Sequence, residues 1–199
     1  AFYNCTGEIT INNKLIEIDH LASTSIEDSD DHPFYGSKFS LVTIGNEVLE
    51  SYGSSIYLKI GQEIKLEDLI YGLLLRSGND AALTLAVNTS KTEENFVKLM
   101  NQKAKELNMK NTIFQNSHGL DEITQNKSTA HDMALLSAYA YKNPIYKEIS
   151  STKRYQTKTD NKSYIWYNRN KLLTTYKYAT GGKNGYTPSS GRTLVTTAS

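Results

Sequence analysis

The chain has 199 residues, which is enough for one large domain or two small lobes. Hydrophobic residues make up 38% and charged residues 22%, as in globular rather than disordered proteins. A net charge of +1 without a long basic run argues against nucleic-acid binding, and no stretch approaches the roughly 18 apolar residues that a membrane span needs. Because there is one cysteine and the four histidines lack metal-ligand spacing, we expect no internal disulfide, metal or cofactor.

The first predicted elements are strands. In residues 1–13 the apolar residues alternate on either side of a turn, which predicts a strand, a turn and a second strand. Residues 14–26 are expected to be a connector. In residues 27–40 four acidic side chains are followed by Pro33, a combination that opposes a buried helix and predicts an exposed loop.

Helical patterns dominate the middle of the chain. Apolar residues between 66 and 74 follow the helix period, and the alanine-rich residues 79–87 indicate a second helix. A capping box over residues 90–93 predicts the start of a third helix. Thr129, with Asp132 three residues later, predicts the start of a fourth.

From about residue 152 the pattern changes to strands, the last of them over residues 193–197. The order of strands, helices and strands predicts an α+β domain, in which the terminal strands form an antiparallel sheet around an inserted helical lobe. The fourteen tyrosines predict a tyrosine-rich surface. We expect a single domain over residues 1–199, with a sheet lobe of residues 1–22 and 150–199, a mainly helical lobe of residues 45–149, and residues 23–44 between them.

Two polar segments carry the candidate chemistry. Ser77-Gly78-Asn79 offers a hydroxyl and an amide, and Lys183-Asn184-Gly185 offers an amine beside a glycine that lets a ligand strand approach the backbone. Acyl transfer needs a nucleophile, a base and donors for the oxyanion, and Ser77 and Lys183 can handle the proton. Taken singly, the first segment is also an ordinary turn, and the second is also a plain Asn-Gly hairpin.

The segments around both motifs resemble the penicillin-binding D-alanyl-D-alanine carboxypeptidases, which have the β-lactamase/transpeptidase-like fold. The resemblance implies a metal-free serine peptidase that removes the terminal D-alanine of peptidoglycan stem peptides and that penicillins acylate. By position it implies catalytic roles for Ser77 and Lys183. The resembling segments are residues 53–82, 107–121, 128–134, 180–187 and 191–195. The implied substrate-binding residues are Asn79, Asn184, Gly185, Tyr186 and Thr187.

The first motif of that family, Ser-x-x-Lys, falls on residues 23–26 and is altered. Ser23 aligns with the nucleophile, but Ile26 stands at the lysine position. An unassisted serine hydroxyl is a poor nucleophile, and loss of a positioned base costs about a hundredfold to ten-thousandfold in rate. We therefore favour a relative with impaired catalysis. An active carboxypeptidase with Ser23 as nucleophile, and a non-catalytic scaffold completed by a partner chain, are the alternatives.

Residues 150–153 also spell Ser-x-x-Lys. They lie where helices give way to strands, far from the expected order, so we interpret them as a chance match. His118 falls at a family position for which we expect a structural role.

The resemblance also implies a ligand and a location. The ligand is a stem peptide or a β-lactam, and the location is extracytoplasmic, at the bacterial cell surface or in the periplasm. The family continues beyond Ser199 with another strand and a helix, so the expected fold is incomplete at its ends. An unpaired sheet edge would favour pairing with a protein partner or a second copy.

Overall fold

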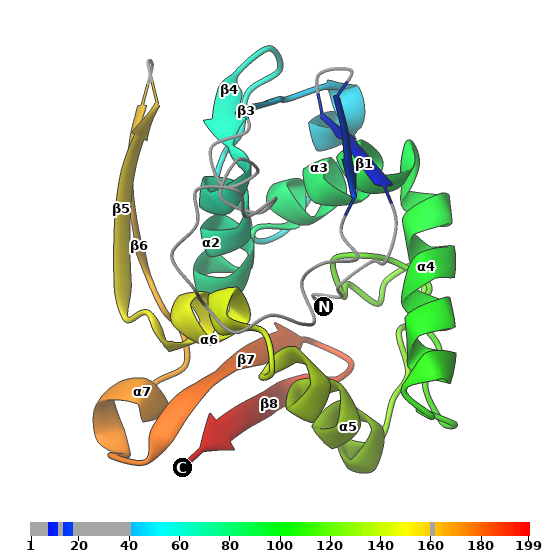
Figure 1. Ribbon diagram of the computed structural model, residues 1–199, viewed down its shortest axis with the longest axis vertical. Coiled ribbons are helices and arrows are strands. Elements are labelled where there is room, and N and C mark those ends of the chain that lie inside the picture. The colour runs from blue at the N-terminus through cyan, green and yellow to red at the C-terminus, as the bar shows by residue number, and fades with distance from the viewer. Residues whose placement is uncertain (1–7, 12–13, 18–40, 160–161) are drawn as a thin grey trace.

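The computed structural model describes residues 8–11, 14–17, 41–159 and 162–199, which form an α+β arrangement (Figure 1). This is the class that the order of predicted elements indicates. No helix in these ranges is long and apolar enough to cross a membrane. The strands are β1 (Glu8–Ile11), β2 (Lys14–Glu17), β3 (Leu41–Thr43), β4 (Glu63–Lys65), β5 (Arg154–Thr159), β6 (Lys162–Tyr167), β7 (Ala179–Thr187) and β8 (Gly191–Ala198). The helices are the 3-10 helix η2 (Asn46–Glu50) and the α-helices α2 (Leu66–Arg76), α3 (Asn79–Ser90), α4 (Glu93–Glu106), α5 (Ala130–Ala140), α6 (Pro144–Ser151) and α7 (Leu172–Thr175).

The described strands form four antiparallel pairs: β1–β2, β3–β4, β5–β6 and β7–β8. The terminal strands therefore form two separate two-stranded sheets. Residues 14–17, for which the sequence predicts a connector, form β2 instead, because they pair with β1 in a register that sets Ile16 opposite Ile9. The first half of the predicted strand–turn–strand unit and the predicted loop over residues 27–40 lie outside the described residues.

Helices α2 and α3 carry the core, as the helical period predicts. Leu69 and Leu74 of α2 are buried in one apolar cluster with Ile64 of β4 and Trp166 of β6. Alanines such as Ala81 make α3 narrow enough to pack closely on α2. A second, smaller apolar cluster consists of Met100, Ala104, Met109, Phe114 and Leu136.

The helix starts show where local signals succeed and where they fail. Helix α5 begins as predicted, with the Thr129 side chain accepting a hydrogen bond from the Asp132 amide. The predicted capping box over residues 90–93 is wrong by two residues, because Ser90 still belongs to α3 and Thr92 caps α4. Lys91 has a φ of 70°, which ends the first helix before the second begins.

The β7–β8 hairpin lies against the helices at the lower side of Figure 1. Its register sets Lys183 opposite Val195 and Gly185 opposite Thr193. Asn184 and Gly185 therefore lie inside β7, which excludes the alternative of an Asn-Gly hairpin turn. The chain reverses after Thr187 instead.

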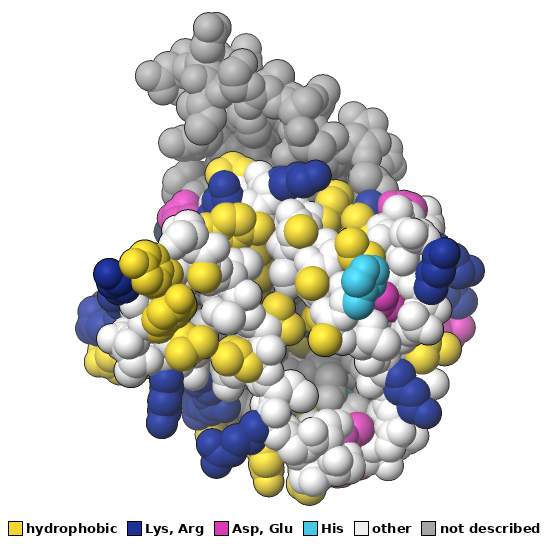
Figure 2. Space-filling view, turned by 90° about the horizontal axis from the view of Figure 1, so that it is seen from below, with side chains coloured by type: hydrophobic (Ala, Val, Ile, Leu, Met, Phe, Trp, Pro, Cys, Tyr) yellow, Lys and Arg dark blue, Asp and Glu magenta, His cyan; other side chains and the backbone are white. Residues whose placement is uncertain are grey.

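The tyrosine-rich surface predicted from the composition is present. Figure 2 shows hydrophobic side chains gathered along one side of the lower face, with Lys and Arg side chains below them. The exposed tyrosines of the described chain include Tyr52, Tyr57, Tyr167, Tyr176, Tyr178 and Tyr186.

Candidate active site

Ser77 and Asn79 lie in the short turn between the two central helices. Ser77 ends α2 in the left-handed conformation, with φ 59° and ψ 45°, and its amide donates to the Leu73 carbonyl at 3.0 Å. A non-glycine residue adopts positive φ only where its surroundings impose it. Asn79 then begins α3 and is buried. The turn therefore places Ser77 and Asn79 two residues apart, where α2 gives way to α3.

A loop before α2 fixes this turn. The Asp80 carboxylate accepts hydrogen bonds from the Ser55 hydroxyl at 2.6 Å and from the Ile56 amide at 3.0 Å. The backbone N–H of Asn79 donates to the Ser54 carbonyl at 2.7 Å. Because a buried carboxylate makes strong hydrogen bonds, the turn is held from outside as well as by its own helices.

Lys183 reaches the turn from strand β7. Its Nζ donates a hydrogen bond to the Ser77 Oγ and another, at 2.6 Å, to the Asn184 carbonyl. Burial lowers the pKa of Lys183 from 10.5 to about 8, because a charged amine loses hydration there. An amine that titrates near neutral pH can accept and return a proton beside the serine hydroxyl.

Strand alternation divides the remaining predicted residues of β7 between two faces. Lys183, Gly185 and Thr187 share the face toward Ser77, whereas Asn184 and Tyr186 belong to the opposite one. Tyr186 is 68% exposed. The structure thus brings Lys183 to Ser77, but it does not bring Tyr186 there.

The Asn79 side chain is partly engaged by the protein. Its Nδ2 donates to the Tyr52 carbonyl at 2.7 Å. A carboxamide has two N–H groups and one carbonyl oxygen, and within the described residues one N–H and the oxygen of Asn79 make no further hydrogen bond. The predicted nucleophile Ser23, and Ile26, lie outside the described residues.

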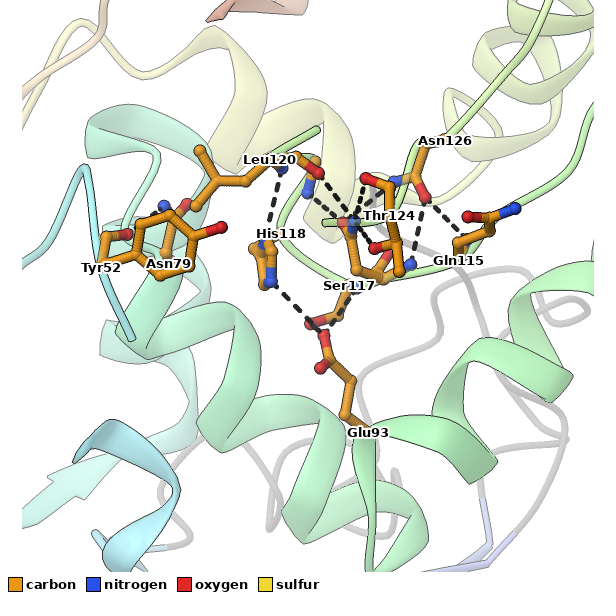
Figure 3. A network of polar contacts seen from close by, with 11 residues as sticks. Tyr52, Asn79, Glu93, Gln115, Ser117, His118, Leu120, Thr124 and Asn126 are labelled. Atoms are coloured by element: carbon orange, nitrogen blue, oxygen red, sulfur yellow. Dashed lines mark hydrogen bonds and ion pairs between the residues drawn. The ribbon is translucent and has the colours of Figure 1, made fainter. Parts of the chain in front are cut away.

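A polar network beside Asn79 was not predicted from the sequence (Figure 3). Glu93, in the first turn of α4, accepts hydrogen bonds from the Ser117 amide at 2.8 Å and from its hydroxyl at 2.6 Å. The His118 ring packs edge-on against Tyr52, with centroids 6.3 Å apart. Burial lowers the pKa of His118, which favours its neutral form. A structural role for this histidine stays a prediction.

Asp121 ties the same loop to the end of β7. Its Oδ2 accepts hydrogen bonds from the hydroxyls of Thr187 at 2.6 Å, Ser190 at 2.7 Å and Ser189. These hydrogen bonds, that from Ser189 foremost, lower the pKa of Asp121 to about 2. The one sequence signal for this residue is its place in a segment, residues 107–121, that resembles the carboxypeptidases.

The second Ser-x-x-Lys sequence does not form a nucleophile–base pair. Ser150 is completely buried, and its hydroxyl donates to the Lys147 carbonyl. Lys153 is exposed at the surface beyond the end of α6.

Comparison with known proteins finds D-alanyl-D-alanine carboxypeptidases. A family profile described as D-alanyl-D-alanine carboxypeptidase matches residues 33–199. The chain is 39% identical over 136 residues to the D-alanyl-D-alanine carboxypeptidase DacF of Bacillus subtilis, which covers 68% of this chain and 35% of DacF. It is 41% identical over 157 residues to DacC of Escherichia coli, which covers 77% of this chain and 38% of DacC. The chain thus spans little more than a third of the length of these curated relatives.

Solved structures agree with these relatives. The D-alanyl-D-alanine carboxypeptidase of Mycobacterium tuberculosis superposes with a TM-score of 0.76 and 32% identity, covering 81% of this chain and 61% of the other. Penicillin-binding protein 5 of Haemophilus influenzae gives a TM-score of 0.73 and 32% identity, covering 81% and 47%.

Proposed function

Since the chain belongs to the D-alanyl-D-alanine carboxypeptidase family, we propose that it binds the D-alanyl-D-alanine end of cell-wall stem peptides and that its catalysis is impaired. The observation that carries the proposal is the hydrogen bond from Lys183 to Ser77, which joins two motifs 106 residues apart. Because such a ligand belongs to the cell wall, the proposed location of the protein is outside the cytoplasmic membrane, at the cell surface or in the periplasm.

Each side chain of the site has a role in this proposal. The Lys183 amine pairs with the terminal carboxylate of the peptide. Asn79 holds a peptide amide with its free N–H and carbonyl oxygen. Gly185, which has no side chain, leaves room for the peptide along the edge of β7, and Thr187 lies further along the same face.

Impaired catalysis follows from the first motif. Ile26 cannot accept the proton of the Ser23 hydroxyl, which is a poor nucleophile while it stays protonated. Loss of a base in this position slows acylation by about a hundredfold to ten-thousandfold. The family match begins at residue 33, so both residues precede it.

An active carboxypeptidase is the second candidate, and the lowered pKa of Lys183 favours it. In this mechanism the Ser23 hydroxyl attacks the carbonyl carbon of the penultimate D-alanine, and its proton passes through Ser77 and Lys183 to the departing D-alanine. Water then hydrolyses the acyl-enzyme ester and regenerates Ser23.

A fluorescent penicillin separates the two candidates. We expect the native chain to show no denaturation-resistant label under conditions that label an ordinary carboxypeptidase. Ile26→Lys should gain a label that disappears when Ser23→Ala is added, whereas the matched control Ile26→Leu should stay unlabelled. Rapid, stoichiometric labelling of Ser23 in the native chain would establish the active enzyme instead.

A further inference from the structure

The loop over residues 116–121 touches both parts of the candidate site. On one side, His118 packs against Tyr52, whose carbonyl accepts the hydrogen bond from Asn79 (Figure 3). Ser117 fastens the same loop to α4 through Glu93. On the other side, Asp121 binds the end of β7. The loop therefore spans from the Asn79 turn to the Lys183 strand.

The contact with β7 is concentrated on one atom. The Asp121 Oδ2 accepts hydrogen bonds from three hydroxyls, those of Thr187, Ser189 and Ser190. Thr187 also accepts a hydrogen bond from the Ser190 amide at 3.0 Å, so the carboxylate is part of the turn that joins β7 to β8. Hydrogen bonds to an ionised carboxylate are stronger than those between neutral groups.

Strand β7 belongs to a small sheet. Within the described chain it pairs with β8 alone, and a two-stranded hairpin is marginally stable by itself. Thr187 lies four residues after Lys183, about 13 Å along the strand, and on the same face. A carboxylate that anchors Thr187 therefore restricts the direction in which the Lys183 side chain points.

We propose that Asp121 is a positioning residue, which holds the end of β7 so that the Lys183 amine stays against the Ser77 hydroxyl. Asp121 acts through the strand and does not touch the ligand. The inference rests on the proposed function only for the importance of the Lys183–Ser77 pair, and its test needs no catalytic activity.

The test is an NMR titration of the lysine Cε signals, with the Lys183 signal assigned by its loss in Lys183→Met. In the native chain we expect Lys183 to titrate near pH 8. In Asp121→Ala the released strand exposes the amine to water, so the midpoint should rise by about one unit or more toward 10.5. Ser189→Ala/Ser190→Ala, which removes two of the three donors, should give a smaller rise.

Asp132→Asn is the matched control. Asp132 is another carboxylate that accepts hydrogen bonds, from the Asn111 amide and the Thr112 hydroxyl, both at 2.8 Å, but it is buried and far from β7 in the sequence. Its replacement should leave the Lys183 midpoint unchanged. If Asp121→Ala folds and its Lys183 midpoint is unchanged, the positioning role of Asp121 is overturned, but the Lys183–Ser77 pair of the proposed function is not. If Asp121→Ala does not fold, an unchanged midpoint in the double serine variant has the same force. If Lys183 of the native chain already titrates near 10.5, the Lys183–Ser77 pair of the proposed function fails as well.

Discussion

At the scale of single residues, the environment of Lys183 has a consequence for stability. Burial lowers its pKa to about 8 in the folded state, whereas an unfolded chain restores a value near 10.5. Between these two pH values the unfolded state binds more protons than the folded state. The stability contributed by this residue must therefore rise as the pH increases from 8 to 10.5, because the cost of burying the charge disappears.

Comparison with Lys183→Met tests this sign. We expect the free energy of unfolding of the native chain, relative to the variant, to be lowest below pH 8 and to increase up to pH 10.5. Urea denaturation of both proteins at pH 7, 9 and 10.5 measures it. A difference that stays constant across this range would show that the Lys183 amine is as well hydrated in the fold as in the unfolded chain.

At the scale of elements, local patterns predict what depends on neighbours in sequence. The apolar period of α2 and the Thr129 cap of α5 were sufficient to locate these helices. The predicted start of α4 lay two residues too early, because Lys91 ends α3 with a positive φ and Thr92 then caps α4. A four-residue sequence pattern does not indicate this change in the backbone. Asn184-Gly185 resembles a turn in sequence, yet pairing with β8 keeps it extended.

Gly182 of β7 lies very close to the backbone of the paired strand β8. It has a φ of 129°, and a Cβ there would lie 2.2 Å from the Val195 carbonyl oxygen of the paired strand. Gly182→Ala should therefore lower the free energy of unfolding by at least about 2 kcal/mol. Thermal or urea denaturation measures this change.

Gly191→Ala is its control. Gly191 also has a positive φ, of 67°, but apart from its chain neighbours no atom of the described residues lies within 4 Å of the added Cβ. Gly191→Ala should lower the free energy of unfolding by less, about 1 kcal/mol, since only backbone strain contributes. Equal losses in the two variants would mean that the close approach of β7 to β8 is absent in solution.

At the scale of the whole molecule, the contacts that build the site join distant segments. The Lys183–Ser77 pair was anticipated only through resemblance to a family, since neither motif alone identifies its partner. The contact between Asp121 and Thr187 spans 66 residues, and hydroxyls and carboxylates are too common in a sequence to indicate which of them meet. Periodicity and capping describe single elements, whereas such pairs depend on how the elements pack.

In the proposed function, Ser77, Asn79 and Lys183 form one site for a D-alanine terminus. The most direct test is calorimetric binding of a short peptide that ends in D-alanyl-D-alanine, compared with its L-alanyl-L-alanine isomer. We predict at least about tenfold tighter binding of the D-isomer, a difference of about 1.4 kcal/mol, and loss of this preference in Lys183→Met. Equal binding of the two isomers, or a preference that survives in Lys183→Met, would contradict the claim.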